Sequence, residues 1–280
     1  MIRRWTTTIT WALFALCAIG GVVACATVPV TGRSQLMLVS PQEEARMGSA
    51  AFQQLAREES GKGRVVPAAQ DPALHQRIRA IGDRIIWAAG LQQAYQWEYL
   101  VIRSADANAA AIAGGKIIVN TGILPITATD AGLAAVLAHE VGHVLAHHTG
   151  ERLSQTGLTQ AALGITAAAL EGGKPAGAGA GTAMAVFGLG AQVGILLPYA
   201  RAQESEADHI GLILMAKAGY DPREAVALWQ RMEQRGGSAG PPQFLSTHPS
   251  HGTRIAQLQQ WMPEAWRYYQ NPNLPLPGPR

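Results

Sequence analysis

Two histidines and a glutamate stand at a spacing that suits a catalytic metal. His139, Glu140 and His143 form the pattern His-Glu-x-x-His within an apolar stretch that predicts a helix. Residues four apart lie on one face of a helix, about one turn from each other, so both imidazoles can reach one Zn²⁺. Glu140 is turned by roughly 100° from His139, which favours contact with a water molecule at the metal. The pattern indicates zinc-assisted hydrolysis of a peptide bond, although so short a motif also occurs in helices whose histidines only form hydrogen bonds.

A catalytic zinc needs a third protein ligand. One common solution is a histidine six residues after His143, reached through a glycine, but Ala146 and Thr149 occupy those two positions. His147 follows His143 by four residues, yet three ligands in a row on one straight helix cannot surround an ion tetrahedrally. We therefore interpret His147 and His148 as C-terminal helix residues that favour the negative end of the dipole.

A second helix can supply a glutamate instead. Glu204 and Asp208 are four apart, so they share one helical face as the two histidines do. Glu204 can bind the metal, while Asp208 can accept the N–H of a ligand histidine and hold that ring in one tautomer. Glu206 points elsewhere, which makes Glu204 the better candidate ligand.

These two motifs together resemble the HExxH…ExxxD zinc metalloproteases of the CAAX prenyl protease and HtpX group (metallopeptidase family forty-eight). The chain looks most like their periplasmic lipoprotein branch, which also includes relatives of a mitochondrial inner-membrane quality-control protease. Three further segments are similar to the family's motifs, namely Asn108–Gly122, Pro198–Arg201 and Ser246–Pro249 with Arg254 after it. The resemblance covers about Thr31 to Met262. Ala110 and Ala113 depart from the family, which often has Phe and Pro there, and this bears on substrate preference.

The resemblance supports a role for each residue of the site. His139, His143 and Glu204 are expected to bind one zinc ion per chain, with Glu140 as general base and Asp208 orienting a ligand histidine.

Two residues further along the chain complete the expected site. His248 is the candidate donor to the oxyanion of the tetrahedral intermediate, and Arg254 is expected to pair with a carboxylate nearby. The alternatives are that His248 is an ordinary loop histidine beside a proline, and that Arg254 simply begins a helix.

A short β-rich stretch, Lys116–Asn120, follows two glycines. In zincin-type folds such a strand runs along the active-site cleft, and the substrate adds to its edge through main-chain hydrogen bonds. The residues expected beside the substrate are Gly114, Gly115, Ile117 and Val119. The alternative is an ordinary sheet strand after a tight turn.

The N-terminus resembles a secretory signal, with two arginines before the apolar stretch Ile9–Ala24. The stretch ends, just before Cys25, in a branched aliphatic residue followed by small ones, like the lipobox of a bacterial lipoprotein. Cys25 would then become the acylated first residue, and Ala26 after it favours the outer membrane. The expected location is the bacterial cell envelope, lipid-anchored and facing the periplasm. An uncleaved N-terminal anchor is the alternative, although the stretch is marginal for a membrane-spanning helix.

Cysteine content and charge limit the other possibilities. The chain has two cysteines, Cys17 and Cys25, so no structural disulfide is expected. The net charge of +3 falls to +1 without residues 1–24, and there is no basic stripe that would indicate nucleic acid. The expected partners are polypeptide substrates and, through lipid on Cys25, a membrane.

The fold class expected is α+β and predominantly helical, a zincin-like metalloprotease with a small sheet lining the active-site cleft. The chain divides into a signal peptide (1–24), a membrane-proximal linker (25–40), one protease domain (41–270) and a Pro-rich tail (271–280). Expected helices span 41–59, 72–89, 130–148, 223–234 and 253–261, and strands span 95–103 and 116–120. The Ala- and Gly-rich segment 156–197 predicts a helix hairpin packed on the core, with contact to lipid or a lid over the cleft as alternatives.

The function expected is a zinc endopeptidase that acts on misfolded or misassembled envelope proteins. The alternative is an envelope chaperone or assembly lipoprotein whose protease site is latent or secondary. A scaffold without metal is disfavoured by the complete ligand set. The sequence indicates neither the cleavage-site preference nor the oligomeric state.

Overall fold

The computed structural model describes residues 25–158, 197–239, 243–248 and 253–278. The expected signal peptide, and most of the expected helix hairpin of residues 156–197, lie outside these ranges. The helices are α2 (Pro41–Gly61), α3 (Pro72–Ala89), α4 (Leu124–Thr127), α5 (Asp130–Leu145), α8 (Leu197–Lys217), α9 (Arg223–Ala239), α10 (Gln243–Thr247) and α11 (Arg254–Gln270). The strands are β1 (Cys25–Thr27), β2 (Ser34–Leu36), β3 (Glu98–Ile102), β4 (Ala109–Ile112) and β5 (Lys116–Asn120). None of the described helices is long and apolar enough to cross a membrane.

Local signals set the ends of the first two long helices. Ser40 caps α2 by accepting a hydrogen bond from the Glu43 N–H at 3.2 Å, and Pro41 occupies the first turn. Asp71 caps α3 by accepting from the Leu74 N–H at 3.0 Å, and Gly90 ends it in the left-handed conformation with φ 71°. These signals are local, so both helices begin at the residues expected from the sequence.

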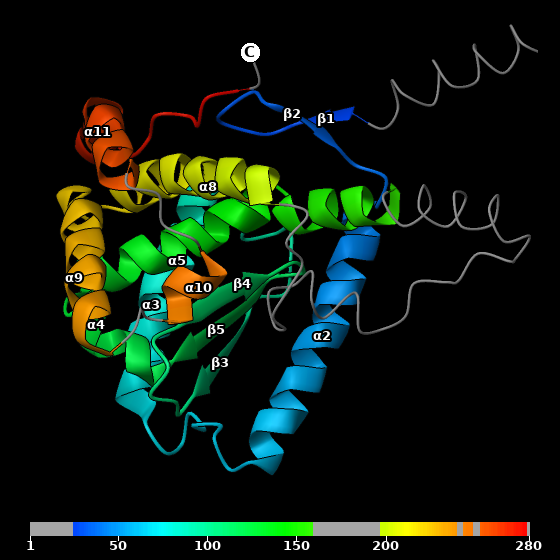
Figure 1. The fold of residues 1–280 in the computed structure, drawn as a ribbon, viewed down its shortest axis with the longest axis vertical. Coiled ribbons are helices and arrows are strands. Elements are labelled where there is room, and N and C mark those ends of the chain that lie inside the picture. The colour runs from blue at the N-terminus through cyan, green and yellow to red at the C-terminus, as the bar shows by residue number, and fades with distance from the viewer. Residues whose placement is uncertain (1–24, 159–196, 240–242, 249–252, 279–280) are drawn as a thin grey trace, which may run out of the picture.

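A three-stranded sheet lies between two helical layers (Figure 1). Its order is β3-β5-β4, with β3 parallel and β4 antiparallel to β5. Because side chains alternate along a strand, Ile117 and Val119 face the main core with α3 and α5, whereas Ile118 faces Phe52 of α2. This mostly helical arrangement around a small sheet confirms the expected fold class.

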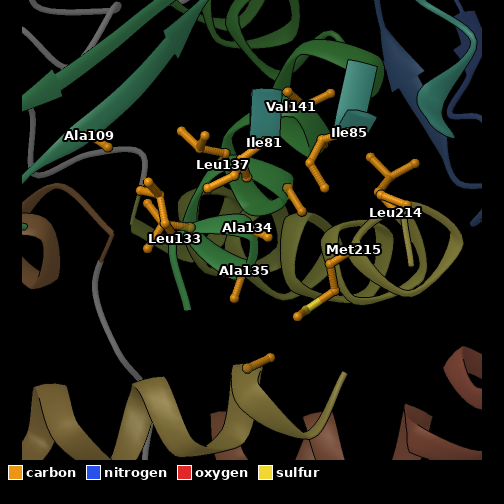
Figure 2. Close-up of a cluster of buried hydrophobic side chains, with 14 of the residues drawn as sticks. Ile81, Ile85, Ala109, Leu133, Ala134, Ala135, Leu137, Val141, Leu214 and Met215 are labelled. Carbon is orange, nitrogen blue, oxygen red and sulfur yellow. The ribbon is translucent and has the colours of Figure 1, made fainter. Parts of the chain in front are cut away.

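Helix α5 forms the centre of the core and is buried from Gly132 to Leu145. Figure 2 shows its apolar side chains between those of α3 and α8. Gly211 of α8 lets the two helices approach closely, because a Cβ at this position would lie 2.8 Å from the His139 backbone nitrogen. The close approach brings the acidic face of α8 against the histidine face of α5.

The structure corrects the expected linker of residues 25–40. Strands β1 and β2 form an antiparallel hairpin, and Val28 and Val30 between them are buried in the main core. The Val30 N–H donates to the Pro277 carbonyl at 3.2 Å, so the Pro-rich tail is also packed against the domain. Apolar residues within a short polar segment are easily overlooked, yet here their burial makes the segment part of the domain.

The structure also ends the metal-site helix earlier than expected. Helix α5 stops at Leu145, and His147 takes φ 52°, so the chain turns before residues 148–158 continue as helix. No glycine or proline marks this turn. His147 and His148 are therefore not the C-terminal residues of one continuous helix.

Candidate metal and catalytic centre

Four side chains from three parts of the chain converge in one cluster. They are His139 and His143 of α5, Glu204 of α8 and His248 just after α10. Each offers one ligand atom, and these four atoms lie within 4.8 Å of one another. The first three side chains are buried, and that of His248 is 12% exposed. The structure therefore brings the three residues expected as ligands together with His248, which was expected as the oxyanion donor.

The two α5 histidines face Glu204 through the same ring nitrogen. Nε2 of His139 lies 3.1 Å from Nε2 of His143 and 3.3 Å from Glu204 Oε2. Nε2 of His143 lies 3.4 Å from the other carboxylate oxygen. Both rings thus keep Nε2 for the cluster, because their spacing of four residues and the close α5–α8 contact point them at one carboxylate.

His248 lies inside this cluster, not beside it. Its Nδ1 is 3.0 Å from Glu204 Oε2 and 3.2 Å from His139 Nε2. Its ring stacks on Phe244 with a centroid distance of 4.5 Å, and its backbone N–H donates to the Phe244 carbonyl at 2.8 Å. The short helix α10 therefore holds the imidazole at the position of a fourth ligand.

Glu140 lies next to the cluster, and its two carboxylate oxygens differ in their surroundings. Oε2 accepts a hydrogen bond from the Ala111 backbone N–H at 3.0 Å. Oε1 is buried and has no hydrogen bond among the described residues, although His248 Nε2 lies 3.2 Å away. A buried oxygen without such a partner implies a further polar species at this point, as a metal site with its water would provide. Three imidazoles and a carboxylate also suit Zn²⁺, so the residues fit that ion.

Burial and the neighbouring charges shift the pKa values of the cluster residues in different directions. Burial would raise the pKa of Glu204, but the nearby His248 and His143 keep it well below its usual range. Burial lowers the pKa of His143 well below its usual value. Burial also acts to lower the pKa of His139, but hydrogen bonds to Asp208 and Glu204 raise it to about 9. Glu204 is thus an anion and His143 a neutral imidazole at neutral pH.

Asp208 and Arg254 lie behind His139, and Arg254 also begins α11. His139 Nδ1–H donates to Asp208 Oδ1 at 2.9 Å, which leaves Nε2 for the cluster. Arg254 Nη2 donates to the same oxygen at 2.6 Å, and the guanidinium lies 3.5 Å from the centre of the Trp229 ring. The carboxylate between them is therefore fixed from both sides.

Sequence reasoning missed the groups behind His143. His148 Nδ1 lies 2.7 Å from His143 Nδ1, and Glu206 Oε2 lies 3.0 Å from His148 Nε2. His148 follows His143 by five residues, a spacing that does not share a face on a continuous helix. Only the turn at His147 brings the two rings together, and nothing in the residue pattern announces that turn.

The structure contradicts the expected substrate strand. Strand β5, with Ile117 and Val119, is central and is paired on both sides, so neither it nor the preceding Gly114 and Gly115 offers a free edge. Gly114 and Gly115 instead take φ 88° and 79° in the turn between β4 and β5.

Among the described strands, the free edge next to Glu140 belongs to β4. The Asn120 N–H donates to the Asn108 carbonyl at 3.0 Å, so the alternation of an antiparallel pair directs the main-chain groups of Ala109 and Ala111 away from β5. The Ala111 N–H that binds Glu140 agrees with this register. The strand was missed because a run of alanines carries neither β-branched residues nor polar alternation.

Comparison with known proteins finds matches over most of the chain. The model of Peptidase family M48 matches residues 72–262. The mitochondrial metalloendopeptidase OMA1 of Schizosaccharomyces pombe is 36% identical over 259 residues, covering 91% of this chain and 72% of the relative. Human metalloendopeptidase OMA1, also mitochondrial, is 28% identical over 258 residues, with coverages of 90% and 49%. The beta-barrel assembly-enhancing protease of Escherichia coli is 26% identical over 270 residues, with coverages of 92% and 53%.

These relatives correct the expected location. Several of those with higher identity are mitochondrial proteins by name, including the yeast relatives at 36% and 32% identity. This finding contradicts a location on a bacterial outer membrane, and that expectation is not retained. It depended on a few residues around Cys25 and on the apolar stretch before them, a pattern too short to identify a compartment by itself.

Proposed function

Because the chain belongs to peptidase family M48 and is a zinc metalloendopeptidase, we propose that the buried cluster around Glu204 is its catalytic centre. His139, His143 and Glu204 bind the single zinc ion. The observation that carries this proposal is the convergence of four ligand atoms within 4.8 Å, next to a buried Glu140 oxygen that has no hydrogen bond within the described part of the chain. Polypeptides are the substrates.

The residues of the chain divide the chemical work. Bound zinc polarises the scissile carbonyl and makes water a better nucleophile at neutral pH. Glu140 takes the proton of the attacking water at Oε1 and then delivers it to the leaving amine. The Ala111 N–H holds the other oxygen of Glu140 in place. Asp208 keeps His139 in the tautomer that presents Nε2 to the cluster.

The substrate is proposed to bind along β4. An extended peptide that adds to a sheet edge gains main-chain hydrogen bonds regardless of its sequence. Ala109 directs its N–H and carbonyl away from β5, and Ala111 its carbonyl. Ala109 is only 2% exposed, so a peptide that pairs here must displace the residues that cover it. The edge leads past Glu140, so a peptide paired here would bring its own carbonyl groups to the cluster. This mode suits substrates with an unfolded, accessible main chain.

Proteins that are misfolded or misassembled at a membrane are the proposed natural substrates. The name of the Escherichia coli relative connects it with assembly of beta-barrel proteins.

Cys25 is exposed at the start of β1 and is proposed to carry a lipid that attaches the domain to the membrane. Labelling with an alkyne fatty acid should modify the wild type and spare Cys25→Ser, and equal labelling of both would contradict the lipid on Cys25.

The decisive experiment measures zinc content and hydrolysis of an unfolded casein-like substrate by residues 26–280. The wild type and Glu140→Gln are compared side by side. We expect one zinc per chain in both and hydrolysis only in the wild type. Appreciable hydrolysis by Glu140→Gln would refute the general-base role, and loss of its zinc would show that Glu140 supports the metal site.

A second candidate function is a latent protease, and the position of His248 favours it. An imidazole that occupies the fourth ligand position excludes water from it. His248→Ala separates this role from the expected oxyanion role. Relief of latency would raise hydrolysis above the wild-type rate, whereas loss of an oxyanion donor would lower kcat by roughly 10²- to 10³-fold. The zinc content of the variant is measured in parallel.

A further inference from the structure

We propose that His148 is a positioning residue for His143 and that Glu206 and the N-terminal hairpin hold it in place. The inference rests on the proposed role of His143 as a zinc ligand. These buried polar groups form a series of hydrogen bonds that begins at the metal site and ends in the turn between β1 and β2.

The distances define the direction of each hydrogen bond from His143 through His148 to Glu206. If His143 keeps Nε2 for the metal, its proton is on Nδ1, which lies 2.7 Å from His148 Nδ1. His148 must then accept at Nδ1, so its own proton is on Nε2. That nitrogen lies 3.0 Å from Glu206 Oε2, an oxygen that accepts the proton. One tautomer of each ring satisfies all four nitrogens without conflict.

Glu206 is in turn held by the N-terminal hairpin. Arg33 Nε donates to Glu206 Oε2 at 2.8 Å, and the Thr31 hydroxyl donates to the other carboxylate oxygen. Arg33 also binds Glu151 with both terminal nitrogens at 2.8 Å. His148 is fully buried and Glu206 nearly so, and buried polar groups persist when they are paired as fully as these are.

The arrangement parallels the support of His139. There Asp208 accepts the Nδ1 proton directly, whereas His143 reaches its carboxylate through one intervening imidazole. In both cases a negative charge behind the ligand fixes the ring and raises its basicity toward the metal. Each α5 histidine thus has its own carboxylate, and the one for His143 depends on residues of the hairpin.

Two substitutions of similar size separate positioning from packing. His148→Phe fills the space but leaves the His143 N–H and the Glu206 carboxylate without their partner. His148→Gln keeps an amide oxygen that can accept from His143 and an amide N–H that can donate to Glu206. His209→Phe is the matched control, because His209 also binds a glutamate, Glu264 at 2.6 Å, and stacks on Trp261.

Zinc affinity measured by chelator competition is the main readout, with the Co²⁺ absorption spectrum as the second. We expect His148→Phe to weaken zinc binding by about 10- to 100-fold and to alter the Co²⁺ spectrum. His148→Gln should recover most of the affinity, and His209→Phe should match the wild type. A folded His148→Phe protein with wild-type affinity and spectrum would overturn the proposal, as would equal losses in the Phe and Gln variants.

Imidazole ¹⁵N NMR of the zinc-loaded wild type tests the same series of hydrogen bonds without any variant. The proposal requires the Nε2–H tautomer of His148 and the Nδ1–H tautomer of His143. A His148 ring with its proton on Nδ1, or doubly protonated at neutral pH, would overturn it even if His148→Phe fails to fold. His143→Ala separates the two levels of inference, since unchanged zinc affinity in that variant would refute the proposed metal site itself.

Discussion

Arg254 shows how single residues in this site serve several partners. Its guanidinium donates to Asp208, lies 3.7 Å from Glu204 and covers the Trp229 ring, while only 3% of the side chain is exposed. Such a buried cation is tolerated because two carboxylates balance its charge. The planar guanidinium alone combines a fork of donors with a face that stacks on indole, so lysine is not an equivalent residue here.

Arg254→Met therefore should lower the free energy of unfolding by about 3 kcal/mol or more, because it leaves Asp208 buried without its cation. Urea denaturation measures this change. Arg223→Met is the control, since Arg223 also pairs with an aspartate and lies over a tryptophan ring, but on the surface. Its cost should stay below about 1 kcal/mol. Equal costs for the two variants would contradict the role of burial.

Glu206 should make stability depend on acid pH. Burial raises its pKa, but hydrogen bonds from His148, Arg33 and Thr31 outweigh this and lower it to about 2. A carboxylate whose pKa is lower in the folded state stabilises the fold above its unfolded pKa, and that contribution is lost as the pH falls through the folded value. The contribution amounts to about 3 kcal/mol and disappears between about pH 4.5 and pH 2.

Comparison with Glu206→Gln isolates this contribution. Unfolding is measured with excess chelator, so that release of zinc does not contribute. The wild type should be the more stable protein at neutral pH, and the difference should shrink steadily as the pH falls below 4.5. A difference that stays constant over this range would show that the stabilisation does not come from the charge of Glu206.

At the scale of elements, the site depends on β4 as much as on the two helices. Helices α5 and α8 supply the expected ligands, but the Ala111 N–H of β4 fixes the orientation of Glu140. The same strand presents its free edge beside that carboxylate. The orientation of Glu140 and the proposed binding of substrate thus both depend on one short strand of alanines.

Proline substitution tests the two properties separately. Ala111→Pro removes the N–H that binds Glu140, and Ala109→Pro removes an N–H on the free edge, while the ladder to β5 keeps its hydrogen bonds in both. We expect Ala111→Pro to lower kcat by about 10-fold or more, because a hydrogen bond to a charged group is lost. Ala109→Pro should mainly raise KM. Steady-state kinetics on an unfolded substrate would contradict this assignment if both variants changed only kcat.

At the scale of the molecule, the N-terminal hairpin belongs to the domain. In Figure 1 the turn between β1 and β2 lies near the first part of α8, and its residues Thr31 and Arg33 bind Glu206 of that helix. The core thus closes around elements from both ends of the described chain. Any attachment at Cys25 would pull on a segment only a few residues from the groups behind His143.

Removal of residues 25–36 should destabilise the protein, because Val28 and Val30 leave the core and Glu206 loses two partners. The burial of two valines alone is worth about 3 kcal/mol. Thermal unfolding of chains that begin at residue 25 and at residue 37 measures the effect, and zinc affinity is expected to fall with it. Equal melting temperatures and affinities would restore the interpretation of this segment as a linker.

Spacing within the sequence determined those parts of the site that lie on continuous helices. The pairs His139–His143 and Glu204–Asp208 are local patterns, and a helix places residues four apart on one face whatever surrounds it. Helices α2 and α3 likewise begin at cap residues that act over three positions. For these features the sequence was sufficient, because the interactions that produce them join near neighbours along the chain.

Only the tertiary structure decided which strand is the edge, where α5 ends and what stands behind His143. Strand order depends on pairing between segments, so the apolar β5 became central and the alanines of β4 became the edge. The turn at His147 places His148 against Glu206, a residue 58 positions further along the chain. These features follow from the packing of the whole chain. A long-range contact costs the entropy of closing the loop between its two residues, and it forms only when other contacts share that cost.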